Sequence, residues 1–270
     1  MKIHTGKGLG DELMATALVR EIKREMPDEM VRVRWAREEL WRFNRWINYG
    51  NSDNGKILDM FSGHAAHWGY SPTLMGKHLG IKIRDLTPEV TLTDAERSVE
   101  YIRPDGRPVA GVDPTAGWIS RRWPFDRWQE VASRLLDLGW RVVELGKRNL
   151  FPRPRIPHSE SFLDRHTLRQ TAAALSQMDL YLGNDSGLAF LAAAVGTPQV
   201  VLHSVVPGSE HASAKTVVIE RRDICNAGCV KECEKSPQIH QREPECLKAV
   251  QPEEVVETAV RTLERFGRRA

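Results

Sequence analysis

The sequence has 270 residues, no long apolar run, only four cysteines and a formal net charge of just +3. No stretch approaches the length of a membrane-spanning helix, and Met1 to Gly10 lack the apolar core of a secretory signal. We therefore expect a cytoplasmic protein. The small positive charge permits anionic ligands but does not by itself indicate a nucleic-acid partner. The length suffices for two domains, and the sequence shows neither internal repeats nor low-complexity tracts.

The segment 179–198 carries the clearest local pattern. The apolar run from Leu180 to Leu182 predicts a strand that is buried on both faces. Residues 184–187 form a polar turn with helix N-cap chemistry. The small apolar residues 189–195 predict a buried helix that ends at Gly196.

The polar turn of this segment has two interpretations. A helix N-terminus offers free N–H groups and the positive end of a dipole, which suit a phosphate group. In an open parallel sheet such a turn lies beyond the carboxyl end of its strand, where ligands bind. Asp185 would then bind a hydroxyl of the molecule that carries the phosphate. Alternatively, Asp185 and Ser186 only cap the helix, and the local pattern leaves both interpretations open.

The N-terminal segment 6–10 has glycine at alternate positions, which lets a ligand or another backbone approach closely. Asp11 and Glu12 follow and precede a helix that we predict over residues 13–25. The glycine spacing fits neither a dinucleotide-binding fingerprint nor a P-loop. Taken alone, this segment therefore predicts that a ligand or another backbone lies close to these glycines, but it does not identify a ligand.

The remainder of the first hundred residues is less regular. Strands are predicted over 31–35 and 56–61, and a helix over 73–79. The segment 37–46 alternates arginine and tryptophan, as do surfaces that bind single-stranded nucleic acid. The same pattern fits an amphipathic helix in which Trp41 and Arg45 share one face.

Residues 86–108 are the best candidate for a linker, because prolines surround a short acidic segment there. Beyond it, strands and helices alternate. Strands are predicted over 108–112, 141–145 and 199–202, and helices over 125–138, 165–177 and 253–266. Together with the segment 179–198, this alternation predicts a parallel, doubly wound α/β domain.

Three motifs stand in a particular order along the chain: Gly8-Leu9-Gly10-Asp11, then Arg121-Arg122-Trp123-Pro124, then Gly183-Asn184-Asp185-Ser186-Gly187-Leu188. In this order they resemble glycosyltransferase family 9, the heptosyltransferase-like enzymes. The resemblance covers the first 27 residues and nearly all of the C-terminal half. It implies the α/β architecture called GT-B, in which two Rossmann-like doubly wound domains face a cleft.

The resemblance also implies how the chain is divided. Residues 1–105 would form a shortened N-terminal domain on the acceptor side. Residues 106–250 would form the domain that binds a nucleotide sugar. Residues 251–270 would form a C-terminal helix that packs back on the N-terminal domain.

The activity implied by the resemblance is inverting, metal-independent transfer of a sugar, such as a heptose, from a nucleotide-diphosphate sugar to an acceptor hydroxyl. Asp11 would be the general base, and Arg122 would hold the diphosphate leaving group. Asp185 would bind the donor sugar. The other donor-binding candidates are Gly10, Thr115, Arg121, His166, Ser186, Gly187 and Leu188. His64 and His67, which lie in a predicted loop of the N-terminal domain, are candidates on the acceptor side.

The four cysteines all fall late in the chain, at Cys225, Cys229, Cys233 and Cys246. Four clustered thiols could hold a structural zinc ion or an iron–sulfur cluster. Their spacing lacks the close C-x2-C pairs that make a zinc prediction strong, so free or reversibly oxidised thiols are the alternative. We expect no cofactor to be required for catalysis.

The acceptor stays open at this point: a glycan, a lipid-linked sugar and a nucleic acid are the alternatives. A basic isoelectric point of about 8.7 and the arginine–tryptophan segment would suit a nucleic acid, as in sugar-modifying enzymes of phage DNA. A non-catalytic nucleotide-binding module is a further alternative. The carboxylate at Asp11 argues against that module, because binding of the donor alone would not need it.

Overall fold

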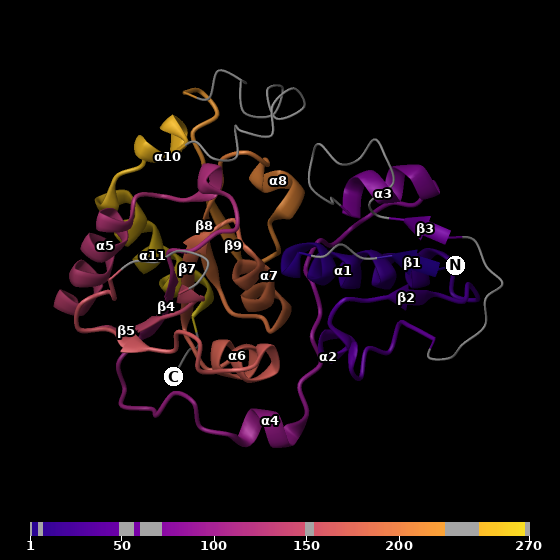
Figure 1. Cartoon of the computed structure of the whole chain (residues 1–270), viewed down its shortest axis with the longest axis horizontal. Coiled ribbons are helices and arrows are strands. Elements are labelled where there is room, and N and C mark those ends of the chain that lie inside the picture. Colours follow the sequence, from indigo (N-terminus) through magenta and orange to yellow (C-terminus); the bar gives the residue numbers. More distant parts are fainter. Residues whose placement is uncertain are drawn as a thin grey trace.

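The structure is a computed structural model that describes residues 2–4, 8–48, 57–59, 72–148, 154–224 and 243–267. Five of the predicted site residues lie outside these ranges: His64, His67, Cys225, Cys229 and Cys233. Figure 1 shows the N-terminal elements in indigo and purple on one side and the C-terminal elements in orange and yellow on the other. Among the helices within the described ranges, none is long and apolar enough to cross a membrane.

The larger sheet has six parallel strands in the spatial order β6-β5-β4-β7-β8-β9. Their bounds are β4 (Val109–Asp113), β5 (Arg141–Glu144), β6 (Glu160–Ser161), β7 (Leu180–Asn184), β8 (Gln199–Leu202) and β9 (Thr216–Ile219). In chain order this is 3-2-1-4-5-6, the doubly wound arrangement that the sequence predicted. The order reverses between β4 and β7, whose every residue is buried. Ligands of such sheets bind beyond the carboxyl ends of the strands at this reversal.

Helices cover both faces of this sheet. Side chains alternate along each strand, so Val112 packs on one face and Val143 on the other. The first face carries α5 (Phe125–Asp137), α10 (Glu245–Lys248) and α11 (Pro252–Phe266), and the second carries α6 (Leu168–Leu175) and α7 (Gly187–Ala194). The short helices η1 (Ile119–Arg121) and α8 (Gly208–His211) follow β4 and β8.

The C-terminal helix α11 does not pack where the resemblance implied. It packs on α5 and on β7, β8 and β9, with Val255 and Ala259 buried in the hydrophobic cluster of that face. Figure 1 shows it in yellow beside α5, on the far side of the molecule from β1. The apolar stripe of α11 fills the face of the six-stranded sheet that α5 leaves uncovered, so the predicted packing on the N-terminal domain is wrong.

The smaller sheet is parallel, with the order β2-β1-β3. Its strands are β1 (Lys2–His4), β2 (Arg32–Arg34) and β3 (Ile57–Asp59), and its helices are α1 (Leu9–Glu25), α2 (Glu38–Trp41) and α3 (Pro72–Leu79). Each predicted strand and the helix at 73–79 are confirmed within a few residues. The helix α4 (Asp94–Ser98) belongs to the predicted linker.

Helix α1 lies between the two sheets and packs directly against α7 and α3 (Figure 1). Every residue from Glu12 to Ile22 is buried. A single hydrophobic cluster joins Ile3 and Leu13 of the N-terminal part to Tyr181 and Leu191 of the larger domain. The two parts therefore share a core along α1.

The arginine–tryptophan segment is not the amphipathic helix that one interpretation predicted. Helix α2 ends at Trp41, so Trp41 and Arg45 do not share a helical face. The indole N–H of Trp41 donates a hydrogen bond to the buried Glu12 carboxylate (3.1 Å), which also accepts the backbone N–H of Ala36 and Arg37 (3.1 and 2.8 Å). Trp41 is fully buried, so it is not available to stack on a nucleic-acid base.

One side chain of the larger domain, Arg169, contacts both the linker and the N-terminal part. The guanidinium group of Arg169, on α6, forms a bidentate pair with Glu96 of α4 (2.5 and 2.6 Å). It also donates to the carbonyl oxygens of Thr91 and Glu39 (both 2.8 Å). Arg169 therefore binds the linker and the N-terminal part at once.

This pair predicts a particular pH dependence of stability. The hydrogen bonds from Arg169 lower the pKa of Glu96 from 4.5 to about 2. A carboxylate whose pKa is lowered on folding stabilises the fold above its unfolded pKa, and this contribution is lost as the pH falls from about 4.5 to about 2. We expect Glu96→Gln to cost about 2 kcal/mol at neutral pH, as for a charged hydrogen bond, and the cost to vanish in that acid range. Urea unfolding of both proteins across the range measures this difference; a difference that stayed constant would contradict the assignment.

Candidate functional site

The candidate site lies at the carboxyl edge of the larger sheet, where the strand order reverses. Charged residues that follow β4, β7 and β8 interact electrostatically with Asp11 in the first turn of α1 there. Helix α1 begins at Leu9, four residues before the predicted start, so Asp11 lies in its first turn. This position brings a carboxylate of the N-terminal part to the edge at which doubly wound sheets bind ligands.

Asp11 is half-buried and close to charged groups of the larger domain. Burial raises the pKa of its carboxyl group, while the positive charge of Arg121 and a backbone hydrogen bond at Gly8 partly oppose this rise. His211 lowers the pKa further and Asp185 raises it. The structure thus brings the predicted base next to Arg121 and Asp185, two of the residues predicted for the donor.

Asp185 is buried and paired with protein side chains. One carboxylate oxygen lies 3.2 Å from the Arg121 guanidinium group, and the other lies 3.1 Å from Nδ1 of His211. Burial opposes ionisation of Asp185, but the Arg121, His211 and His203 side chains outweigh it and hold the pKa of Asp185 well below its usual range. The predicted contact between Asp185 and a donor sugar therefore stays a prediction.

The motif around Arg122 is fixed by the asparagine of the polar turn. The Asn184 side-chain oxygen accepts the backbone N–H of Trp123 (3.1 Å), and its amide group donates to the carbonyl oxygen of Pro114 (2.9 Å). Arg122 donates from Nε to the carbonyl oxygen of Ala116 (2.8 Å), and burial lowers the pKa of its guanidinium group. Asn184 therefore links the polar turn after β7 to the motif that contains Arg122 and to the loop after β4.

Arg121 lies over the ring of Trp118, 4.3 Å from its centroid, and is mostly buried. Such stacking orients a guanidinium group without neutralising its charge. Because Asp185 holds one end of the group, Arg121 presents a positive charge to the neighbourhood of Asp11.

Asp113, at the end of β4, is a site residue that the sequence motifs did not reveal. Its buried carboxyl group accepts the backbone N–H and the hydroxyl of Thr115 (2.9 and 2.5 Å). It also accepts the hydroxyls of Ser186 (3.1 Å) and Tyr181 (3.2 Å), and burial raises its pKa. Thr115 and Ser186, both predicted donor ligands, are therefore positioned by Asp113.

The start of α7 decides between the two interpretations of the polar turn. Ser186 occupies the N-cap position, yet in the described part of the chain no side chain caps this helix. The Ser186 hydroxyl binds Asp113 and the Asp185 carboxylate binds Arg121 and His211. The interpretation in which these two residues only cap the helix is therefore wrong.

Two glycines predicted to bind the donor lie where α1 and α7 cross. A Cβ atom on Gly10 would lie 2.9 Å from the ring of Phe190, and one on Gly187 would lie 2.8 Å from Cβ of Leu9. Both positions thus need glycine for the close packing of the helices. Leu188, a third donor-binding candidate, packs partly buried against the same hydrophobic cluster.

His166 is not brought to the predicted base. Its half-buried ring lies against Tyr101 of the linker and Phe162, with ring centroids 5.4 and 4.7 Å away. Burial and the nearby charge of Arg165 lower the pKa of His166. No contact within the described ranges joins it to Asp11, and its predicted role in binding the donor stays a prediction.

Two buried histidines complete the site, and no sequence motif indicated them. His203 follows β8 and His211 lies on α8. Nδ1 of His203 lies 3.3 Å from the carbonyl oxygen of Val206, and burial lowers the pKa of its ring. The His211 ring packs edge-on against Phe190, with centroids 5.2 Å apart.

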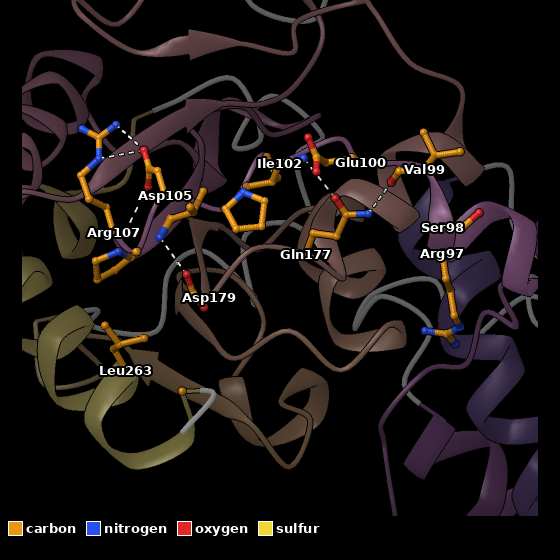
Figure 2. Close-up of a pocket in the computed structure, with 15 residues that line it drawn as sticks. Arg97, Ser98, Val99, Glu100, Ile102, Asp105, Arg107, Gln177, Asp179 and Leu263 are labelled. Atoms are coloured by element: carbon orange, nitrogen blue, oxygen red, sulfur yellow. Dashed lines mark hydrogen bonds and ion pairs between the residues drawn. The ribbon is translucent and has the colours of Figure 1, made fainter. Parts of the chain in front are cut away.

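A cavity of about 570 Å³ lies elsewhere, between the linker, α6 and the end of α11 (Figure 2). It borders the amino ends of β4 and β7, at Val109 and Asp179. Its polar groups bind one another: Gln177 accepts the backbone N–H groups of Tyr101 and Ile102 (2.9 and 3.0 Å). The candidate site therefore stays at the opposite edge.

Cys246 is the one member of the cysteine group within the described residues. It lies on α10, buried in the hydrophobic cluster that also contains Leu247 and Val250. The predicted metal site as a whole stays a prediction.

The two parallel sheets, and a site that gathers residues from both parts of the chain, define an α/β protein of the GT-B type. A protein-family model described as glycosyltransferase family 9 (heptosyltransferase) matches residues 65–242, more than half of the chain. The chain belongs to this family, as the three motifs predicted.

Individual relatives agree with this assignment. Lipopolysaccharide heptosyltransferase 1 of Pseudomonas aeruginosa is 27% identical over 198 residues, which are 67% of this chain and 56% of that protein. The chain thus spans little more than half of this curated relative.

Among solved structures, the ADP-heptose lipopolysaccharide heptosyltransferase II of Escherichia coli superposes with a TM-score of 0.64 at 17% identity, over 98% of each chain. The iron-containing dodecameric heptosyltransferase TibC of enterotoxigenic Escherichia coli, in complex with ADP-D-β-D-heptose, has a TM-score of 0.70 at 17% identity. That match covers 98% of this chain and 76% of TibC. At these identities the structural matches show a shared fold.

Proposed function

We propose that this protein transfers a sugar from a nucleotide-diphosphate sugar to an acceptor hydroxyl, with inversion at the anomeric carbon. The observation that carries the proposal is the position of Asp11. A carboxylate on the first turn of α1 lies beside the Arg121–Asp185 pair, at the edge where a doubly wound sheet binds nucleotides. A base and a cationic group are thus adjacent, as a displacement at a phosphorylated sugar requires.

In the proposed step the acceptor oxygen attacks the anomeric carbon while the bond from that carbon to the diphosphate oxygen breaks. Asp11 takes the proton of the acceptor hydroxyl, and the electron pair of the broken bond leaves with the nucleotide diphosphate. Burial raises the pKa of Asp11, which makes its carboxylate a better proton acceptor than an exposed one.

The leaving group gains negative charge as the bond breaks, so cationic groups and N–H donors lower the barrier there. Arg121 and Arg122 supply guanidinium groups from the loop before α5. The uncapped start of α7 offers backbone N–H groups of Gly187 and Leu188 to a phosphate. Asp113 positions Thr115 and Ser186 for the same phosphates.

The donor we propose is ADP-heptose. The support comes from solved structures of the same fold, whose titles name ADP-D-β-D-heptose with TibC, and ADP and ADP-2-deoxy-2-fluoro heptose with the heptosyltransferase WaaC. The acceptor, whether a glycan, a lipid-linked sugar or another hydroxyl compound, is not specified by this argument.

We further propose that the transfer itself needs no metal and that the four late cysteines hold a structural metal. Cationic side chains already stand where a metal would neutralise the diphosphate. TibC, which has the same fold, is described as iron-containing. This supports the proposal that a protein of this fold can bind a metal. Cys246, on the packed helix α10, would then anchor the site to the larger domain.

Calorimetric titration of the purified protein with ADP, UDP, GDP and CDP tests the proposed donor site. We expect ADP to bind most tightly. Arg122→Ala should weaken that binding by about 10- to 100-fold, because charge-assisted hydrogen bonds contribute about 1.5–3 kcal/mol. Arg261→Ala, which removes an exposed arginine from α11, is the matched control and should leave binding unchanged.

The proposal fails if none of the four nucleotides binds, or if Arg122→Ala binds ADP like the unsubstituted protein. Tight binding of a different nucleotide would keep the transfer reaction and replace the proposed donor. Each result thus bears on a separate part of the proposal.

A further inference from the structure

We propose that Asp185, His203 and His211 form a binding site for a divalent transition-metal ion, with Zn²⁺ as the ion that their ligand types favour. This site goes beyond the proposed sugar transfer, which uses no metal. It is also separate from the cysteine group, since it uses no thiol.

The three side chains converge from neighbouring elements of the carboxyl edge. Asp185 follows β7, His203 follows the adjacent strand β8, and His211 lies on α8. One ligand atom from each residue lies within 4.8 Å of the corresponding atoms of the other two. All three residues are almost fully buried, with exposed fractions of 2%, 2% and 6%. The triad is therefore fixed by the fold of the sheet edge.

An unsatisfied polar atom at this place points to a missing partner. Nε2 of His211 is buried and has no hydrogen-bond partner, whereas both Asp185 oxygens are paired, one with Arg121 and one with Nδ1 of His211. A buried polar atom without a partner costs about 1–3 kcal/mol. A metal ion bound there would give Nε2 of His211 a partner.

The donor set is the one that first-row transition ions accept. Two imidazole rings and one carboxylate are common ligands of Zn²⁺, with bonds of about 2.0–2.2 Å. Ligand atoms around such an ion lie about 3.4 Å apart, so atoms that are up to 4.8 Å apart would have to approach by at most about 1.4 Å. Nδ1 of His211 lies 3.1 Å from one Asp185 oxygen, a hydrogen bond that leaves Nε2 as the nitrogen for the ion.

Arg121 sets a condition on this site. Its guanidinium group is paired with Asp185, and a second cation beside the same carboxylate would be repelled. Binding of the metal therefore requires Arg121 to release Asp185 while it keeps its stacking over Trp118. Removal of the Arg121 charge should therefore strengthen metal binding, an effect that a cluster with only a structural role would not show.

Titration with Co²⁺, followed by its visible absorption, tests the site in the full-length chain carrying Cys225→Ser, Cys229→Ser and Cys233→Ser. These three substitutions remove three of the four thiols from the competition for metal, and Cys246 stays within its hydrophobic cluster. We expect one Co²⁺ per chain, without the intense near-ultraviolet bands of thiolate ligands. Zn²⁺ should displace the Co²⁺.

Substitutions then assign the ligands. His211→Gln and His203→Gln should each weaken Co²⁺ binding by at least about 10-fold, since each removes one of three ligands. His78→Gln, on the exposed face of α3, is the matched control and should bind like the parent. Arg121→Gln should bind Co²⁺ about 10-fold more tightly, because the competing charge is gone.

The proposal is overturned if the triple Cys→Ser chain binds no Co²⁺, or if His211→Gln and His203→Gln bind it as tightly as the parent. Unchanged or weaker binding by Arg121→Gln would also overturn it. Far-ultraviolet circular dichroism checks that each variant is folded. The Arg121 variant keeps the test decisive if a histidine variant does not fold, because it leaves all three ligands in place.

Discussion

Asp11→Asn is expected to lower the rate of sugar transfer by about 10²- to 10⁴-fold, the range over which general bases contribute to catalysis. Asparagine keeps the shape of the side chain on the first turn of α1 but cannot take up the acceptor proton. Nucleotide binding should stay within about twofold, because the proposed contacts to the diphosphate come from the larger domain. The measurement is release of nucleoside diphosphate from the sugar donor, with an acceptor that supports turnover by the unsubstituted protein.

The neighbouring carboxylate provides the control. Glu12 is fully buried and accepts hydrogen bonds from Ala36, Arg37 and Trp41, so its role is structural. Glu12→Gln should lower the free energy of unfolding by about 2 kcal/mol. It should retain turnover wherever it is folded. Turnover by Asp11→Asn at the unsubstituted rate would remove Asp11 from the role of base.

Gly187→Ala is expected to have the second-largest effect, on both stability and transfer. The added Cβ would lie 2.8 Å from Cβ of Leu9, an atom that no side-chain rotation can move. Helix α1 must then shift, and Asp11 shifts with it relative to Arg121. Overpacking of this kind costs about 1–3 kcal/mol, more than the gain of up to about 1 kcal/mol from alanine in a helix. A displacement of about 1 Å at a reacting group lowers rates by roughly 100-fold.

Thermal unfolding and the transfer assay measure the two effects. Gly117→Ala is the matched control, because a Cβ there would meet nothing within 4 Å. Gly10→Ala offers an independent check, since its Cβ would contact the Phe190 ring at 2.9 Å and Phe190→Leu should restore part of the loss. Normal activity of Gly187→Ala would mean that the crossing of α1 and α7 does not set the geometry of the site.

Elements with a strong local pattern could be predicted from the sequence. The strand β7 and the helix α7 follow from an apolar run, a polar turn and a terminating glycine, and their doubly wound arrangement followed from the alternation of elements. Helix α6 was placed too early, because Thr167 and Gln170 form a capping box that starts it at Leu168. Its bounds could therefore have been read from the sequence.

Elements decided by tertiary contacts could not be predicted. The segment 37–46 has a helical pattern, but the buried carboxylate of Glu12 binds Trp41 and the helix ends there. The packing of α11 depends on which sheet face is left uncovered, which a local pattern does not contain.

The same limit applies to the site. Asp11, Arg122 and Asp185 belong to motifs of adjacent residues and could be found from sequence. Asp113, His203 and His211 are single residues at strand ends or on a four-residue helix, and only the order of the strands brings them together. A polar residue directly after a buried strand, as at Asp113, was the one available signal.

The burial of α1 on all sides limits the amino-acid substitutions that this protein can accept during evolution. A helix on a surface has one face that accepts almost any polar residue, so tolerated substitutions recur with the helical period of 3.6 residues. From Glu12 to Ile22 no residue of α1 is exposed, because α7 and α3 pack against it and its side chains share one hydrophobic cluster with Ile3 and Val33 of the smaller sheet. This stretch therefore has no face on which neutral variation can accumulate, and substitutions there must be compensated in elements of both sheets.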